Sequence, residues 1–306
     1  KTFTNPGTKQ VLKLIAPTIM GMAAYQLNDV VSTAIASRSG VGIVSSLQYS
    51  LRLQELILGI FAVSIGTVIL PDLSGLAQKK EWEEFNNMLI QAIKIIVLIT
   101  IPVTFYSLVN GRELIALLYK NKSFTEESVL LTLGEFRFHI AGLFFIAANR
   151  IISPAFYAQG NTKLPTLAGI ISFVTNIIFA LALVKPMSGN GIALALSIAS
   201  MVNTIFLFIF MKKMESIKIK KVLKDTLIYI LKITIYSVIA AIPCYFLRPT
   251  FVNLFANRSR IFSEGLPLVC SLVIFATIGI FELFVTKDSI TVSIVRKIKQ
   301  KNVRKN

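Results

Sequence analysis

Residues 45–74 read SSLQYSLRLQELILGIFAVSIGTVILPDLS and combine a membrane-like apolar run with two charges. The part from Leu56 to Leu70 carries no charge and forms most of a candidate spanning helix. Arg52 and Glu55 lie just before it, with no Pro or Gly to separate them from the apolar run. A charge at membrane depth costs at least ~2.5 kcal/mol on insertion scales, so an arginine here indicates a functional site.

The composition of the whole chain is typical of a membrane protein. Of its 306 residues, 54% are hydrophobic and 15% are charged, and the mean hydropathy is +0.71. This is too apolar for an ordinary soluble domain. We predict an all-α, polytopic membrane protein with eight transmembrane helices, because apolar stretches of about 20 residues fall near 11–37, 44–70, 86–109, 129–156, 163–184, 190–211, 227–247 and 263–286.

The arrangement of the 32 Lys and Arg residues predicts the topology. If both chain ends are cytoplasmic, 19 of them lie on that side, 8 lie on the other and 5 lie within spans. This asymmetry fits the positive-inside rule. We therefore predict a basic cytoplasmic linker at 212–226 and a basic cytoplasmic tail at 287–306. The tail is expected to contact anionic lipids rather than nucleic acid, because it directly follows a spanning helix.

Signatures of catalysis and metal binding are sparse. Cys244 and Cys270 fall in apolar stretches without metal-ligand spacing. The single histidine, His139, follows Glu135 by four residues, so we expect a hydrogen-bonded structural pair on one helix face, with a proton relay as the alternative. No P-loop, G-x-S-x-G or H-E-x-x-H pattern occurs. We predict a transport protein and not an enzyme, with no metal site and no cofactor.

Two charged residues face each other across the first predicted turn. Asp29 and Arg52 each lie roughly 16 to 18 Å from the turn near Gly40, at 1.5 Å per residue. One interpretation is a neutralising bridge that locks the two helices together. The other is that Arg52 faces a hydrated cavity and binds an anionic group, with Glu55 one turn away to orient the guanidinium.

Three further polar residues are candidates for binding. Arg150 lies four residues before Pro154, near the cytoplasmic end of its span, where it either snorkels or contacts a lipid headgroup. Asn176 lies in the middle of a span, and we favour a hydrogen bond between helices over ion coordination. Asn28, in the first span, is the second candidate ion ligand.

Three segments, in chain order, resemble one family of transporters. They are YSLRLQELILGIFAVSIGTVILPDLS, LLYKNKSFTEES and SPAFYAQGNTKLPT. They are similar to the second helix, the loop after the third helix and the A-P-x-F-Y-x-x-x-[DN]-T-[KR]-x-P connection in the C-terminal half of the MviN/MurJ-type lipid II flippases. That family belongs to the multidrug/oligosaccharidyl-lipid/polysaccharide exporter superfamily, in which two six-helix lobes are followed by two more helices.

The resemblance implies an organisation and a substrate. The eight predicted helices correspond to the seventh through fourteenth, with one six-helix lobe at 1–211 and two additional helices, which line a groove for the lipid tail, at 227–286. The first six-helix lobe is then a missing partner, supplied by a longer or two-part protein. The implied substrate is the undecaprenyl-pyrophosphate-linked disaccharide-peptide, flipped by alternating access across the bacterial cytoplasmic membrane.

The resemblance also assigns residues. Arg52 matches the family's arginine on this helix and Glu55 its acidic residue. With Asp29 and Arg150, which the positions of the charges suggest, they are the expected substrate-binding residues. Some members carry acids where this chain has Ser32 and Ala180. The driving force is expected to be the membrane potential or a monovalent cation.

Three alternatives remain open at this point. The chain could export another polyprenyl-linked glycan, or serve as a non-transporting scaffold half. A polyprenyl-phosphate glycosyltransferase would need acidic catalytic residues in an outer loop, where the sequence offers only Glu113, Glu126 and Glu127.

Overall fold

The computed structural model describes residues 27–293, apart from the side chains at 61–68 and 70, and every regular element in this part is α-helical. The predicted all-α fold is confirmed. A helical segment at 27–36 is followed by α2 (Ile43–Gln78), α3 (Trp82–Tyr119), α4 (Glu126–Ala141), α5 (Leu143–Tyr157), α6 (Lys163–Met187), α7 (Gly189–Met211), α8 (Ile219–Phe255) and α9 (Arg260–Val285).

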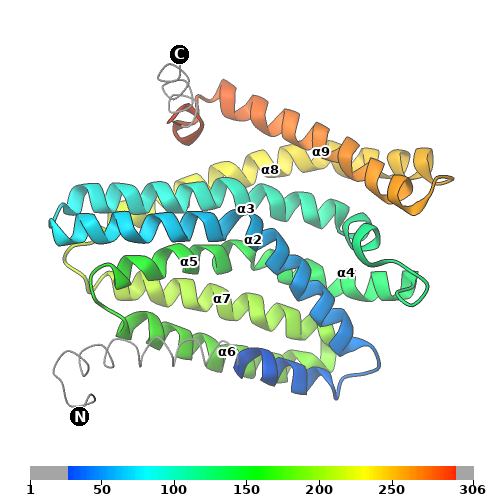
Figure 1. The fold of residues 1–306 in the computed structure, drawn as a ribbon, viewed down its shortest axis with the longest axis horizontal. Coiled ribbons are helices and arrows are strands. Elements are labelled where there is room, and N and C mark those ends of the chain that lie inside the picture. The colour runs from blue at the N-terminus through cyan, green and yellow to red at the C-terminus, as the bar shows by residue number, and fades with distance from the viewer. Residues whose placement is uncertain (1–26, 294–306) are drawn as a thin grey trace, which may run out of the picture.

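The helices lie side by side along the long axis of the molecule (Figure 1). On one side, α8 packs against α3, and α9 packs against both of them. In the middle, α2 contacts α3, α4 and α5, and α7 contacts α4 and α5. The hairpin of α6 and α7 places α6 and the helix at 27–36 on the opposite side from α9 (Figure 1).

Six helical stretches among the described residues are long and apolar enough to cross a membrane. They correspond to the six predicted spans from 86–109 onward, and one of them joins α4 and α5 across 126–157. The predicted spans at 11–37 and 44–70 fall partly on residues or side chains outside the described part. The count of eight transmembrane helices therefore stays a prediction.

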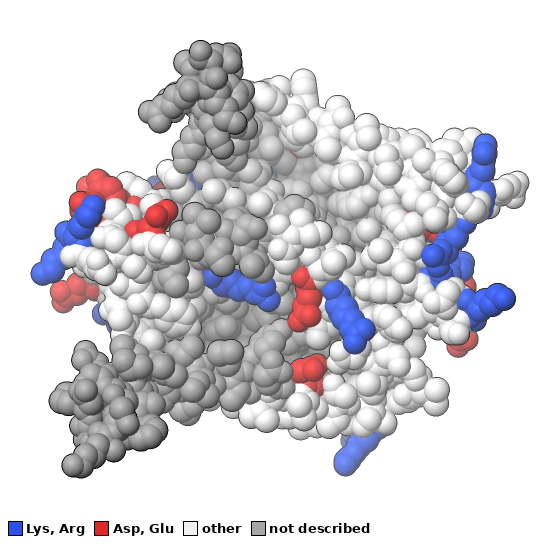
Figure 2. Space-filling model, viewed as in Figure 1, with Lys and Arg blue, Asp and Glu red and all other residues white. Residues whose placement is uncertain are grey.

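The surface supports a membrane environment. Only 17% of the apolar window of α6, and 17% of that of α9, is buried inside the protein. Figure 2 shows a broad uncharged surface, with Lys, Arg, Asp and Glu gathered at its two ends and a small group of both signs near the middle. Exposed Leu and Ile side chains are stable in lipid, whereas exposed charges are not.

The predicted span at 129–156 is broken at Gly142, because α7 approaches the chain closely there. A Cβ on Gly142 would lie 2.4 Å from the hydroxyl oxygen of Ser197 and 2.9 Å from its Cα. That hydroxyl donates to the backbone carbonyl of Phe138 at 2.6 Å. The serine thus satisfies a carbonyl at the end of α4, where the helical pattern is interrupted.

Within the predicted linker at 212–226, α8 begins at Ile219. The connection before it is fixed by the buried side chain of Asn86. Its amide nitrogen donates to the carbonyl of Ser216 at 2.8 Å, and its oxygen accepts from the backbone N–H of Lys218 at 2.8 Å.

The start of the predicted tail is anchored to α8 by Asp288. Its carboxylate is 1% exposed and accepts hydrogen bonds from Lys232 Nζ at 2.8 Å and from the Tyr229 hydroxyl at 3.1 Å. Burial alone would raise the pKa of Asp288, but the hydrogen bonds from Lys232 and from the backbone of Thr291 hold it below its usual value.

We expect Gly191→Ala to destabilise the α6–α7 hairpin. A Cβ at Gly191 would lie 2.3 Å from the backbone carbonyl oxygen of Leu183, which no rotamer change can relieve. Forcing a methyl group into a packed contact costs typically about 1 to 3 kcal/mol, so the melting temperature should fall. Gly169→Ala is the matched control, because no atom lies within 4 Å of its added Cβ. Equal melting temperatures for the two variants would contradict this packing.

Candidate functional site

One cavity of the lobe has a volume of about 530 Å³. It is bounded by the helix at 27–36 and by α2, α5, α6 and α7. Its size falls within the range of small-molecule sites, roughly 300 to 1,000 Å³. Its lining holds one basic and one acidic side chain, Arg150 and Glu55, among amides and hydroxyls that include Asn28, Asn149, Ser153, Ser200 and Asn203.

Helical spacing directs these side chains into the cavity. On α2, the lining residues Leu51, Gln54, Glu55 and Leu58 follow the i, i+3, i+4, i+7 pattern of one helix face. On α5, the lining residues 146, 149, 150 and 153 follow the same pattern. The structure therefore brings the predicted residues Glu55 and Arg150 to one cavity from two helices.

Arg52 lies on a different face of α2. It is exposed, is not among the residues that line the cavity, and lies close enough to the Tyr119 hydroxyl to interact with it electrostatically. Tyr119, at the end of α3, packs against Tyr49 with ring centroids 4.9 Å apart and the ring planes tilted by 52°. The predicted role of Arg52 in binding remains a prediction.

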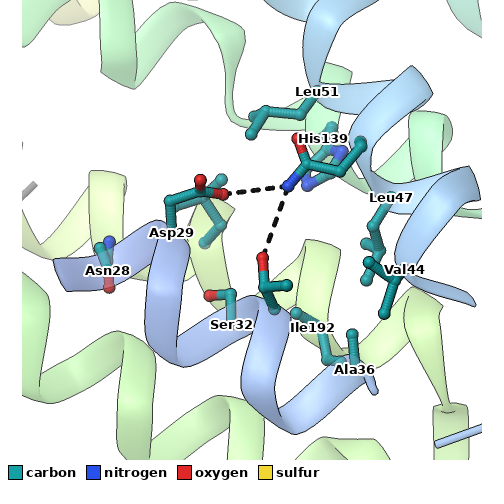
Figure 3. Close-up of a pocket in the computed structure, with 12 residues that line it drawn as sticks. Asn28, Asp29, Ser32, Ala36, Val44, Leu47, Leu51, His139 and Ile192 are labelled. Atoms are coloured by element: carbon teal, nitrogen blue, oxygen red, sulfur yellow. Dashed lines mark hydrogen bonds between the residues drawn. The ribbon is translucent and has the colours of Figure 1, made fainter. Parts of the chain in front are cut away.

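Asp29 is paired differently from the predicted bridge. Among the residues that the structure describes, its carboxylate accepts a hydrogen bond from Gln48 Nε2 at 3.2 Å, and the ion pairs do not join it to Arg52. Figure 3 shows Asp29 and Asn28 at the end of a smaller cavity of about 50 Å³, which His139 also lines. Asn28, Leu51 and Leu196 line both cavities, so the two are neighbours.

Asn176 makes the predicted hydrogen bond between helices. Its side chain is completely buried, and its amide nitrogen donates to the Asn28 side-chain oxygen at 2.6 Å and to the Ser32 hydroxyl at 3.1 Å. The structure thus joins both candidate ion ligands by a hydrogen bond. The positions where some family members carry acids hold the uncharged Ser32, which also contacts Asn176, and Ala180, which is buried on α6. Between residues 27 and 293, no group of three or more His, Cys, Asp or Glu side chains could hold a metal ion. Ion coordination by Asn28 and Asn176 stays a prediction.

The predicted hydrogen bond between Glu135 and His139 is wrong. Within the described part of the chain, each of the two side chains on α4 bonds to a serine of α2 instead. Ser46 contacts the Glu135 carboxyl at 2.9 Å, and Ser50 contacts His139 Nδ1 at 2.6 Å. Glu135 and His139 lie one helical turn apart and so do the two serines, which is why the helices pair them in register.

Sequence reasoning missed a charged network at one end of α3, α4, α8 and α9. Arg112 donates to Glu126 at 2.8 Å and to Glu264 at 2.9 Å, while Arg248 donates twice to Glu113, at 2.7 and 2.9 Å. Lys120 adds a further contact to Glu126, so three acids and three bases balance. The sequence did contain a signal, since acidic and basic residues both occur at the ends of these four apolar helices.

Comparison of the sequence with known proteins gives one family. Residues 1–259 match the family model described as lipid II flippase MurJ. A Treponema pallidum protein named probable lipid II flippase MurJ is 44% identical over 299 residues, which cover 98% of this chain and 57% of that protein. A Burkholderia cenocepacia protein named lipid II flippase MurJ is 27% identical over 218 residues, covering 70% of this chain and 41% of that protein. The chain thus spans about half the length of the curated relatives that it matches.

Comparison of the structure with solved structures gives one match in the same family and a second, more distant match. A solved structure of lipid II flippase MurJ in an inward closed conformation matches with a TM-score of 0.73 and 27% identity, over 92% of this chain and 56% of that one. An outward-facing multidrug resistance transporter of the MATE family and MOP superfamily matches with a TM-score of 0.60 and 18% identity, over 90% of this chain and 64% of that one. The second match shows a shared fold.

Proposed function

This chain belongs to the lipid II flippase MurJ family, and we propose that it forms one six-helix lobe and the two additional helices of a flippase that moves lipid II across the bacterial cytoplasmic membrane. The single observation that carries the proposal is the cavity of about 530 Å³ that holds Arg150 and Glu55 within an apolar helical lobe of that family. The family is one of transporters, and the chain is a multi-pass membrane protein.

In this proposal, arginine side chains bind the pyrophosphate that joins the undecaprenyl tail to the disaccharide-peptide. A guanidinium keeps its charge and presents a planar fork that matches phosphate oxygens. Arg150 does so from α5 within the cavity, and Arg52 does so from the exposed face of α2. Glu55, which lies one helical turn after Arg52 and lines the same cavity as Arg150, is the acidic group that orients these arginines. Asp29, which accepts a hydrogen bond from Gln48, is the second acidic group of the proposed binding site.

Transport follows from alternating access between this lobe and a second six-helix lobe. The large polar headgroup moves through the space between the lobes, while the undecaprenyl tail stays in lipid. The exposed apolar side chains of α8 and α9 support the role of these helices as a groove for the tail. Membrane potential or a monovalent cation drives the cycle, since one charge moved across 100 mV is worth about 2.3 kcal/mol.

The proposed orientation places both chain ends in the cytoplasm. The excess of Lys and Arg in the linker at 212–226 and the tail at 287–306 supports this side, and the tail contacts anionic lipid there. The loop between α8 and α9 then faces the periplasm.

The binding role can be tested on the purified chain with Arg150→Ala. A hydrogen-bonded charge contributes about 1.5 to 3 kcal/mol, so we expect the affinity for lipid II in lipid nanodiscs to fall by roughly 10- to 100-fold. Arg150→Lys should bind with intermediate affinity, because it keeps the charge but loses the fork. Arg137→Ala is the matched control, since Arg137 is exposed on α4 and does not line the cavity.

Unchanged affinity in Arg150→Ala would contradict the proposed site. A different polyprenyl-linked glycan that displaces lipid II at lower concentration would instead favour an exporter of that glycan.

A further inference from the structure

A polar seam runs between α2 and α4 on the face away from Arg52. Three side chains of α2, four residues apart, meet two side chains of α4, also four residues apart, and all five are at most 4% exposed. Ser46 contacts Glu135, Ser50 contacts His139 Nδ1, and Gln54 donates to the backbone carbonyl of His139. Buried polar contacts of this kind are expensive in a membrane-embedded helix pair unless every group is satisfied.

The contacts of Ser46 bear on the protonation state of Glu135. The hydroxyl oxygen of Ser46 lies 3.0 Å from the backbone carbonyl of Ile43 and 2.9 Å from Glu135 Oε1. A serine has one O–H, and a carbonyl oxygen can only accept. If Ser46 donates to Ile43, the contact to Glu135 is a hydrogen bond only when the carboxyl is protonated and donates to the serine.

The alternative, an ionised Glu135, leaves a buried charge without compensation. Its carboxylate would have one neutral donor, Ser46, and its second oxygen has no hydrogen-bond partner among the described residues. The start of α7 faces the carboxyl, since a Cβ on Gly189 would lie 2.0 Å from Oε1. A helix N-terminus favours a negative charge by only about 0.3 to 1 kcal/mol, whereas burying an ion costs several kcal/mol.

The charged groups on the surrounding helices are engaged elsewhere or face away. In the described part of the chain, no ion pair includes Glu135. α7 carries no charged side chain, and Arg137 of α4 is exposed. Arg112 and Glu113 of α3 and Glu126 of α4 belong to the charged network, and Arg150 of α5 lines the large cavity. Lys94 of α3 lies over the Tyr229 ring of α8. The other charged side chains on α4 and on the helices packed against it are exposed, namely Arg52, Glu55 and Asp72 of α2, Glu83 and Glu84 of α3, and Glu127 of α4.

A small cavity lies beside this seam. His139 lines this cavity of about 50 Å³ together with Asp29 and Gln48 (Figure 3). Its volume exceeds the roughly 10 to 15 Å³ that one water molecule needs, and its lining combines polar side chains with apolar ones such as Leu47 and Ile192.

We propose that Glu135 is a proton-binding site and that its proton occupancy is linked to the packing of α2 against α4. With the proton bound, the neutral acid fits the closed seam. When the carboxyl gives its proton to water, the carboxylate is left without a counter-charge. Separation of α2 from α4 would then allow water to hydrate the Glu135 carboxylate. The ligand of this site is therefore the proton, and the site stands whether or not the proposed lipid substrate is correct.

Infrared spectroscopy of the purified chain in lipid tests the proposal directly. At neutral pH, Glu135→Gln should remove a carboxylic-acid C=O stretching band that is present in the wild-type protein. Glu113→Gln is the matched control: Glu113 is also 1% exposed, but Arg248 donates to both of its oxygens, so it contributes a carboxylate and no acid band. A wild-type spectrum without a band that depends on Glu135 would overturn the proposal.

Thermal unfolding gives an independent measure of the same linkage. The unfolded chain loses the Glu135 proton above about pH 4.3, whereas the folded protein keeps it. The wild-type melting temperature should therefore fall relative to that of Glu135→Gln as pH rises from about 4.3 through neutrality, until the folded protein also loses the proton. Parallel curves for the two proteins would contradict the linkage. Failure of Glu135→Gln to fold would also overturn the proposal, because glutamine reproduces the shape and the neutrality of the protonated acid.

Discussion

Arg248→Ala should lower the free energy of unfolding by about 3 kcal/mol, because it strands a buried carboxylate. Glu113 is 1% exposed and receives two hydrogen bonds from Arg248, while Arg112 lies 3.7 Å away and is already engaged with Glu126 and Glu264. We use the lower end of the range known for broken buried pairs, since the Arg248 side chain is itself 31% exposed. Thermal unfolding in lipid measures the change.

The network also predicts which second change restores stability. Arg248→Ala combined with Glu113→Gln removes both charges and should recover most of the loss, since breaking a buried pair costs mainly through the charge that is left behind. Arg258→Ala is the control, because Arg258 is exposed and no ion pair involves it in the described part of the chain. If the double variant is no more stable than Arg248→Ala, the network does not hold α8 against α3 in this way.

Arg52→Ala, in this chain together with the proposed second six-helix lobe, should abolish rescue of a flippase-depleted strain while membrane abundance stays near normal. The arginine is exposed on α2, so its removal leaves no cavity in the core. Arg52→Lys should rescue partly, because an ammonium keeps the charge and loses the bidentate geometry. Colony growth and immunoblotting of the membrane fraction measure the two quantities separately.

A purely structural Arg52 makes a different prediction. If Arg52 served only to neutralise Asp29, then Arg52→Ala would mainly reduce the amount of folded protein, and Asp29→Ala with Arg52→Ala would restore abundance and growth. The hydrogen bond from Gln48 to Asp29 supports the opposite result, continued inactivity at normal abundance, because Asp29 keeps a partner without the arginine.

Much of the fold follows from the sequence because apolar length and charge are local properties. The runs near 163–184 and 190–211 appear as α6 and α7 with boundaries shifted by a few residues. The α2 face that holds Glu55 could be predicted from 3.6-residue spacing, and so could the polar contact of Asn176. The break at Gly142 could not, because it depends on how closely Ser197 of α7 approaches.

The remaining misses concern which helices are neighbours. Glu135 and His139 lie on one helix face, so the sequence indicated a pair, but α2 offers serines at the same spacing and takes both contacts. Glu113 and Arg248 are separated by 135 residues, and only the packing of α8 on α3 brings them together. Tertiary packing decides which charged residues far apart in the sequence become partners. The distribution of charges along the chain does not reveal that packing.

Translocation of fluorescent lipid II across vesicle membranes tests the central claim most directly. We predict that this chain, joined to the six-helix lobe of the whole protein, moves lipid II to the opposite leaflet. The same protein carrying both Arg52→Ala and Arg150→Ala should fall to the rate of empty vesicles while remaining folded. Translocation by that double variant at the wild-type rate would contradict a flippase that holds its substrate through these arginines.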